Sequence, residues 1–162
     1  MAAQAAIDRR SVPLYTPEQR VRRDETPWTV VQGILAPLQF GVFLISLGLV
    51  VRFLATGDGL WEATLSVVIK TMFLYLIMVT GAIWEKVVFG QYLLAPAFFW
   101  EDVFSFVVIA LHTAYMISLF AGVAAETQMW IAVAAYAAYV VNATQFLLKL
   151  RAARLDAAGA PA

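Results

Sequence analysis

Cysteine is absent from this chain of 162 residues, and histidine occurs only once, as His112. Without cysteine the chain can form no disulfide framework, no thiolate metal site and no cysteine nucleophile. A single imidazole also excludes a zinc or di-iron cluster built on histidine ligands. Any catalysis must therefore come from carboxylates, His112, lysines, tyrosines or amide side chains.

Charged residues are also scarce, at 14% of the chain, against about 25% in typical soluble domains. The chain is 62% hydrophobic and its mean hydropathy is +0.79, which is the composition of an integral membrane protein. The lipid bilayer is therefore an expected partner. Eleven basic and eleven acidic residues cancel, so the net charge does not suggest a nucleic-acid partner.

Four apolar runs are each long enough to cross a membrane, because about 20 helical residues span the hydrocarbon core. They predict an all-α fold, a polytopic bundle of four transmembrane helices in one domain at 16–155. Disordered tails are expected at 1–15 and 156–162. Pro37 lies inside the first run and removes a backbone hydrogen bond, so a kink is expected there. The expected spans are about 28–54, 60–84, 101–122 and 128–148.

A short helix is predicted before the first span. Thr16, Pro17 and Gln19 have the residue types of an N-cap, a first helical position and a third helical position. The helix that they begin is basic and ends near Glu25, and it is expected to lie on the membrane surface.

The distribution of basic residues predicts the orientation in the membrane. Four spans place both chain ends on one side, and the loops on the other side hold at most Arg52. Basic residues concentrate at the two ends, so the positive-inside rule places both termini in the cytoplasm. The connection between the second and third spans then faces the cytoplasm too. The basic residues at the ends are Arg9, Arg10, Arg20, Arg22, Arg23, Lys149, Arg151 and Arg154.

The stretch from Trp84 to Phe106 combines many aromatic residues with three carboxylates, Glu85, Glu101 and Asp102. Carboxylates beside a bilayer are costly to keep there, so their presence suggests a function. An aromatic surface edged with acids suits a large, flat, apolar molecule that needs a proton delivered. The aromatic residues are Trp84, Phe89, Tyr92, Phe98, Phe99, Trp100, Phe104 and Phe106.

These carboxylates also have structural interpretations. Glu85 with Lys86 can be an interfacial pair at a helix end, and Glu101 with Asp102 can cap the third span, where negative charge suits the helix dipole. Capping is the preferred interpretation for Asp102 alone. Glu85 and Glu101 each follow a tryptophan, and a carboxyl group packed on an indole in a dry site can serve as a general acid.

Other polar residues within the spans have structural or functional interpretations. His112 would lie roughly 16 Å deeper than Glu101 on the same helical face. It could be an interhelical hydrogen-bonding group, a proton relay, or an axial ligand to the metal of a planar macrocycle. Asn142 and Gln145 share a face and either join helices or bind substrate carbonyls. Lys70 is expected to snorkel to the outer surface.

Four stretches of the chain resemble the 3-vinyl bacteriochlorophyllide hydratases, small membrane enzymes of bacteriochlorophyll biosynthesis in purple bacteria. The resemblance covers nearly the whole chain except its tails, and the block from Trp84 to Ser105 is its most specific part. The stretches are TPEQRVRRDETPWTVVQGILAPLQF (16–40), VTGAIWEKVVFGQYLLAPAFFWEDVFS (79–105), IALHTAY (109–115) and NATQFLLKLRAARL (142–155).

The resemblance implies a lyase that adds water across the C3 vinyl group of chlorophyllide a, giving a 3-(1-hydroxyethyl) group. It implies no redox cofactor, and a location in the bacterial inner (intracytoplasmic) membrane. Contacts with other enzymes of pigment biosynthesis, or a homo-oligomer, are compatible with it.

On this basis we expect Glu85 or Glu101 to be the acid, with the other, or Asp102, as the base that activates water. Trp84, Tyr92, Phe99 and Trp100 are expected to stack on the macrocycle, and Lys86 or Arg23 to hold its propionate. Asn142 and Gln145 are expected to contact the substrate. No metal site of the protein's own is expected, although His112 is a candidate axial ligand to the magnesium of the substrate.

The alternative is a non-enzymatic membrane protein that binds, carries or assembles tetrapyrroles. Such a protein would need the aromatic surface and His112, but it would not need several carboxylates at the edge of that surface. Pigment recovered chemically unchanged would support this alternative.

Overall fold

The computed structural model describes residues 13–158, with side chains described as far as Leu155. Those residues form α-helices and no strand, which confirms the predicted all-α fold. The remaining parts of the two predicted tails, 1–12 and 159–162, lie outside the described residues. The helices are α2 (Pro17–Glu25), α3 (Pro27–Thr56), α4 (Leu60–Phe89), α5 (Phe99–Phe120) and α6 (Ala125–Ala158).

The starts of α2 and α3 follow from their capping residues. The Thr16 hydroxyl accepts a hydrogen bond from the Gln19 amide at 3.2 Å, and the Gln19 side chain accepts one from the Thr16 amide at 2.9 Å. This reciprocal pair is a capping box, as the sequence predicts. The Thr26 hydroxyl caps α3 by accepting from the Trp28 amide.

Two glycines end the helices of the first pair. Gly57 and Gly90 have φ angles of +78° and +89°, a left-handed conformation that terminates α3 and α4. The second span was expected to end at Trp84, but α4 continues to Phe89 because no helix-breaking residue occurs before Gly90. Glu85 therefore lies on the helix and not in the following connection.

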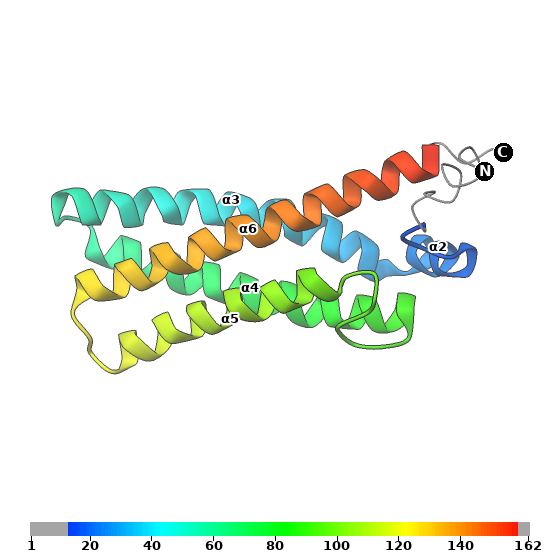
Figure 1. Ribbon diagram of the computed structural model, residues 1–162. Coiled ribbons are helices and arrows are strands. Elements are labelled where there is room, and N and C mark those ends of the chain that lie inside the picture. The colour runs from blue at the N-terminus through cyan, green and yellow to red at the C-terminus, as the bar shows by residue number, and fades with distance from the viewer. Residues whose placement is uncertain (1–12, 159–162) are drawn as a thin grey trace, which may run out of the picture.

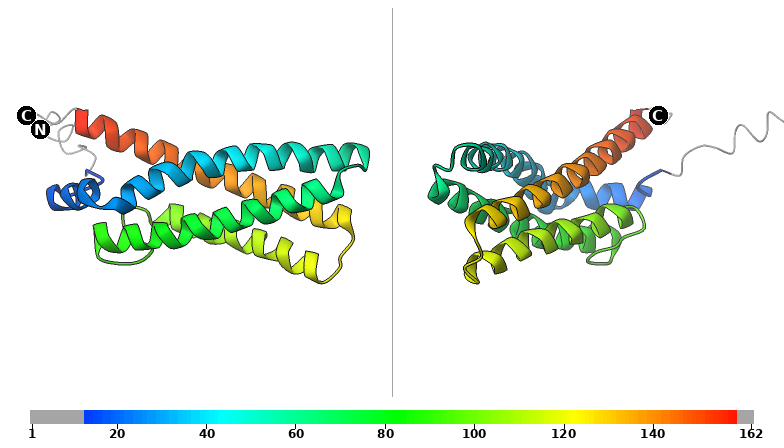
Figure 2. Two further views of the ribbon diagram at one scale, coloured as in Figure 1. Left: turned by 180° about the vertical axis from the view of Figure 1, so that it is seen from behind. Right: turned by 60° about the vertical axis from the view of Figure 1, so that its left-hand side comes forward.

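The four long helices form two antiparallel hairpins, α3 with α4 and α5 with α6 (Figure 1). Each hairpin is closely packed within itself, whereas the packing between the two hairpins is less extensive. Helix α2, the α4–α5 connection and the end of α6 all lie at the same end of the bundle (Figures 1 and 2). Helix α3 continues through Pro37, and its ribbon bends in that part of the helix.

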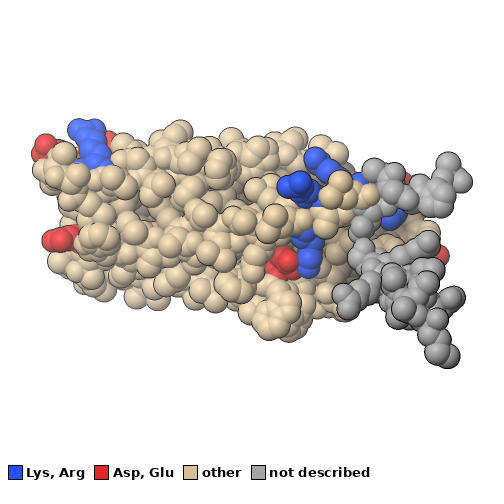
Figure 3. Space-filling model, turned by 45° about the horizontal axis from the view of Figure 1, so that its top comes forward, with Lys and Arg blue, Asp and Glu red and all other residues tan. Residues whose placement is uncertain are grey.

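The surface of the bundle is suited to lipid. All four long helices are long and apolar enough to cross a membrane. On the face shown in Figure 3, charged residues gather toward the two ends of the bundle and leave an apolar band between them. The long helices also expose large apolar side chains such as Ile45, Ile34 and Val79. The protein is therefore a helical membrane protein.

A second, smaller core lies at the end of the bundle near α2. It is built around Tyr15, Val88 and Phe98, with Trp84 and Phe89 packed against it. Tyr15, the last residue of the predicted N-terminal tail, is buried and stacks on Phe89 with the ring centroids 5.8 Å apart. This small core supports the connection between α4 and α5, and the three carboxylates lie on the helix ends that this connection joins.

Candidate active site

Two buried carboxyl groups from different hairpins meet at the α4–α5 connection. The Asp102 carboxylate accepts a hydrogen bond from the Leu94 amide at 2.6 Å, and the Glu85 carboxylate accepts one from the Ala95 amide at 3.3 Å. The exposed fractions of Glu85 and Asp102 are 6% and 3%. Because the two amides are consecutive along the chain, they hold the two carboxyl groups side by side.

The Glu85 and Asp102 carboxyl groups are also close enough for the charge of one to act on the other. Two buried carboxylates at short range repel each other, which favours a proton on one of them. The arrangement can therefore hold one acidic proton beside one carboxylate, in a site from which most water is excluded.

The backbone at Leu94 is strained. Leu94 has a φ of +59°, and it is the one non-glycine residue with a positive φ in the described range 13–158. A left-handed conformation costs an L-residue roughly 1–2 kcal/mol. Strain of this kind persists where the surroundings impose it, often at functional sites. Here it turns the Leu94 and Ala95 amides toward the two carboxyl groups.

Asp102 lies in the first turn of α5, where negative charge suits the helix dipole as the structural interpretation expects, but its carboxylate makes no capping hydrogen bond. The first residues of α5 have no side-chain cap, and the Asp102 carboxylate is directed instead to the Leu94 amide in the connection. The reason is the turn at Leu94, which brings the connection back over the start of α5.

Glu101 is bound differently from Glu85 and Asp102. Its carboxylate forms an ion pair with the Lys149 ammonium at 2.7 Å, and Lys149 also donates to the Ala97 carbonyl. The backbone carbonyl of Glu101 accepts from the Asn142 amide group at 2.8 Å. Glu101 and Asn142 therefore join α5 to α6, and the Glu101 charge is compensated by a cation.

The predicted aromatic residues divide into two groups. Trp84 belongs to the small core, where it packs edge-on against Phe98, and its indole donates to the Thr29 hydroxyl at 2.9 Å. Tyr92 and Trp100 are 61% and 65% exposed, and Phe99 packs edge-on against Trp100. Exposed aromatic rings therefore lie in the connection, at Tyr92, and at the start of α5, at Phe99 and Trp100.

Lys86 lies beside one of these exposed rings. Its ammonium donates to the Gly90 carbonyl at 2.7 Å and lies 5.4 Å from the centroid of the Tyr92 ring. Lys86 is exposed, so its positive charge is available to an anionic group near Tyr92. Arg23 instead lies over the buried Tyr15 ring, with its guanidinium carbon 4.8 Å from the ring centroid.

His112 is remote from the two carboxyl groups. Ten residues of α5 separate it from Asp102, a distance of about 15 Å along the helix. The imidazole is fully buried, and its Nδ1 bonds to the Val108 carbonyl at 2.8 Å. Among residues 13–155, no group bonds to His112 Nε2 or to the Gln145 side-chain oxygen. His112 is thus not brought together with Glu85.

Lys70 does not reach the outer surface, contrary to the expectation that it snorkels. The side chain is fully buried, and its ammonium lies 3.7 Å from the centroid of the Tyr139 ring. The reason is its position on α4, on a side that packs against α6 and not against lipid.

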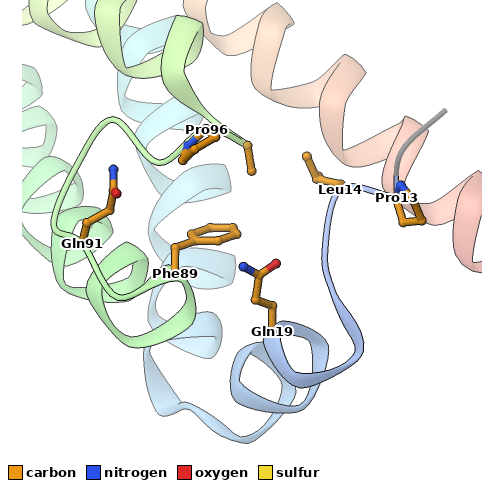
Figure 4. Close-up of a pocket in the computed structure, with 7 residues that line it drawn as sticks. Pro13, Leu14, Gln19, Phe89, Gln91 and Pro96 are labelled. Atoms are coloured by element: carbon orange, nitrogen blue, oxygen red, sulfur yellow. The ribbon is translucent and has the colours of Figure 1, made fainter.

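A groove of about 640 Å³ opens at the same end of the bundle, within the range of about 300–1,000 Å³ typical of ligand pockets. Figure 4 shows the N-terminal segment and α2 on one side of it and the α4–α5 connection on the other. Sequence reasoning missed it because one wall belongs to the predicted tail. The lining residues are Pro13, Leu14, Gln19, Phe89, Gln91, Pro96 and Ala97.

No group of three or more histidine, aspartate or glutamate side chains in the described part of the chain is arranged to hold a metal ion. His112 Nε2 is the nitrogen that could bind a metal carried by a ligand. Because Nδ1 bonds to a carbonyl, it carries the ring proton of the neutral imidazole and leaves the Nε2 lone pair free. A macrocycle would reach that nitrogen only after the helices around it had separated.

Comparisons with known proteins identify the family. The sequence profile of the 2-vinyl bacteriochlorophyllide hydratases (BCHF) matches residues 15–152. A 2-vinyl bacteriochlorophyllide hydratase of Rhodobacter capsulatus is 72% identical over 145 residues, which are 90% of this chain and 85% of the relative. One of Cereibacter sphaeroides is 73% identical over 143 residues, 88% of this chain and 89% of the relative. No solved structure gives a significant match. The family description differs from the sequence-based expectation only in the number given to the vinyl group, and the chain belongs to the 2-vinyl bacteriochlorophyllide hydratase family.

Proposed function

We propose that this protein is a hydratase that adds water across the vinyl group of a bacteriochlorophyllide-type tetrapyrrole, the substrate class in the names of its relatives. We take the substrate to be chlorophyllide a and the product to be its 3-(1-hydroxyethyl) derivative. The observation that carries the proposal is the pair of buried carboxyl groups, Glu85 and Asp102, held side by side by consecutive amides.

The two carboxyl groups supply the two proton transfers that hydration needs. The protonated carboxyl group gives its proton to the terminal vinyl carbon, and the cation left on the inner carbon is delocalised into the macrocycle. The carboxylate removes a proton from water as the water oxygen bonds to the inner carbon. One acid is consumed and one is formed, so exchange of a proton between the two groups restores the site.

The hydrogen-bond lengths support an assignment of the two roles. The Leu94 amide lies 2.6 Å from Asp102, whereas the Ala95 amide lies 3.3 Å from Glu85. Short hydrogen bonds are typical of an ionised acceptor. We therefore assign Asp102 as the carboxylate that activates water and Glu85 as the acid. The charge of Asp102 would also stabilise the developing cation.

Glu101 is a weaker candidate for proton transfer because Lys149 neutralises it at 2.7 Å. We assign Glu101 to the support of the site, since its contacts with Lys149 and Asn142 hold the start of α5 against α6. No electrons are gained or lost when water adds to a vinyl group, so we propose that no redox cofactor takes part.

We propose that the macrocycle binds at the exposed aromatic surface of Tyr92, Phe99 and Trp100. These side chains lie beside the connection that carries Leu94 and Ala95, and aromatic rings suit a flat, apolar ligand. Lys86, next to Tyr92, is positioned to bind the propionate. The groove bounded by Phe89 and Pro96 borders the same connection and offers further contact area.

We also propose that both termini and the carboxyl pair face the cytoplasm, in the bacterial inner membrane. Helix α2 and the end of α6 lie at the same end of the bundle as the α4–α5 connection (Figure 1). Basic residues gather in these two helix ends, including Arg20, Arg22 and Arg151. The positive-inside rule favours the cytoplasm for such an end.

The test is mass spectrometry of chlorophyllide a after incubation with membranes that contain the protein, with no cofactor added. The expected product is heavier by one water, and Glu85→Gln and Asp102→Asn should each lower its rate of formation by about 100-fold or more, the typical contribution of general acid–base catalysis. Glu62→Gln is the matched control, because Glu62 is an exposed acid at the start of α4.

Two outcomes would contradict the proposal. Well-folded Glu85→Gln and Asp102→Asn proteins with normal turnover would show that these groups do not transfer the protons. Pigment that binds to the wild-type protein but keeps its mass would instead support the carrier alternative.

A further inference from the structure

A second group of buried polar side chains lies at the boundary between the two hairpins, inside the membrane-spanning part of the bundle. Lys70 of α4 and His112 and Tyr115 of α5 are all fully buried. Within the described part of the chain, Lys70 Nζ, His112 Nε2 and the Tyr115 hydroxyl have no hydrogen-bond partner. Since His112 is about 15 Å from Asp102 along α5, this group is separate from the carboxyl pair.

Lys70 and His112 approach the same face of α6. The Lys70 ammonium lies 3.7 Å from the ring centroid of Tyr139, and the His112 and Tyr136 ring centroids are 5.8 Å apart. Tyr136 and Tyr139 are three residues apart, so they are neighbours on one face of the helix. Lys70 and His112 therefore contact two rings that are neighbours on the same face of α6.

The chemistry of these atoms restricts what can bind between them. A lysine amino group donates hydrogen bonds whether or not it is ionised. Because Nδ1 of His112 donates to the Val108 carbonyl, Nε2 of the neutral ring can only accept. A group that joins them must therefore accept from Lys70 and donate to Nε2. Water both accepts and donates, and it therefore satisfies both groups.

We propose that Lys70, His112 and Tyr115 form an internal water site between the two hairpins. In this site water accepts a hydrogen bond from Lys70 Nζ and donates one to His112 Nε2, with the Tyr115 hydroxyl as a further partner. Buried polar atoms without protein partners are normally satisfied by ordered water.

The surroundings of the site support this assignment. The Tyr136 hydroxyl bonds to Ser46 at 2.6 Å, and Ser46 bonds to Ser66 at 2.7 Å. These contacts join α6 to α3 and α4, so hydroxyl groups cross the boundary next to Tyr136. The less extensive packing between hairpins is consistent with a boundary joined by polar contacts and water.

The single histidine makes this proposal directly measurable. In protein labelled with nitrogen isotope at histidine only and placed in bilayers, solid-state NMR reports on His112 alone. We expect a neutral ring with the proton on Nδ1, and transfer of magnetisation from water protons to Nε2. No transfer from water in the wild-type protein, or a direct bond between Lys70 Nζ and Nε2, would overturn the proposal.

Two variants test whether the water lies beside Lys70 at the boundary between the two hairpins. Lys70→Met removes the group that donates to the water, so the transfer to Nε2 should be lost. Thr113→Val is the matched control, because Thr113 bonds to Tyr75 at 2.7 Å across the same boundary without contact to the site. The control should keep the transfer, and its loss there as well as in Lys70→Met would contradict a localised site. The wild-type measurement decides the question even if a variant fails to fold.

Discussion

At the scale of single residues, the site depends on the backbone of Leu94 more than on its side chain. The positive φ of Leu94 turns two consecutive amides toward two carboxyl groups. Glycine adopts this conformation without cost, whereas a β-branched residue is a genuine outlier there. The amide of this residue is also required, because it donates to Asp102. Substitutions at Leu94 therefore separate backbone geometry from side-chain chemistry.

We expect Leu94→Gly to keep its hydratase activity and Leu94→Val to lose it. Glycine relieves backbone strain of roughly 1 kcal/mol, and this gain should offset the loss of the leucine side-chain contacts. Valine disfavours the positive φ, so it should turn the two amides away from the carboxyl groups. Activity and thermal unfolding in detergent measure the two effects. Leu93→Val is the control, since Leu93 has no positive φ and the variant should behave like the wild type. Full activity in Leu94→Val would show that the strained turn is not needed.

At the scale of secondary structure, a partly exposed ion pair adds to the packing and hydrogen bonds that hold α5 to α6. The side chains of Glu101 and Lys149 are 8% and 26% exposed, so their environment is intermediate between a buried and a surface pair. Removal of one partner would leave the other charge with little access to water. Such a loss costs about 3–5 kcal/mol for buried pairs and at most about 1 kcal/mol for exposed ones.

Lys149→Met should therefore destabilise the protein by about 2 kcal/mol, between those limits. Adding Glu101→Gln to Lys149→Met should restore part of that loss, because it removes the unpaired charge. Chemical or thermal unfolding of the two single variants and the double variant gives the coupling energy. If the two effects were simply additive, the ion pair would not stabilise the contact between α5 and α6.

The helices could be predicted from sequence largely because their signals are local. The four apolar runs, the Thr16 capping box and the glycines at the helix ends act within a few residues. The partners of the carboxylates were not predictable in this way. Glu101 pairs with Lys149 far along the chain, and Glu85 meets Asp102 only because Leu94, which carries no sequence signal for a positive φ, turns the connection. For Lys70, burial depends on which side of α4 faces α6.

At the scale of the whole molecule, the buried polar side chains gather in two places, one at an end of the helical bundle and one in its interior. The carboxyl pair lies beside the connection at the α2 end of the bundle. The proposed water site lies between the two hairpins, which pack closely within themselves. A substrate bound at the proposed aromatic surface would therefore reach the carboxyl pair without passing through the water site.

The side of the membrane on which the carboxyl pair lies can be measured cleanly because the chain has no cysteine. Glu25→Cys, at the exposed end of α2, and Asp58→Cys, in the turn between α3 and α4, place single thiols at opposite ends of the bundle. In spheroplasts, a membrane-impermeant thiol reagent should label the Asp58→Cys protein and should label the Glu25→Cys protein only after lysis. This result would place the Glu85–Asp102 pair at the cytoplasmic surface, as the basic helix ends predict. Labelling of the Glu25→Cys protein in intact spheroplasts would place it on the opposite side.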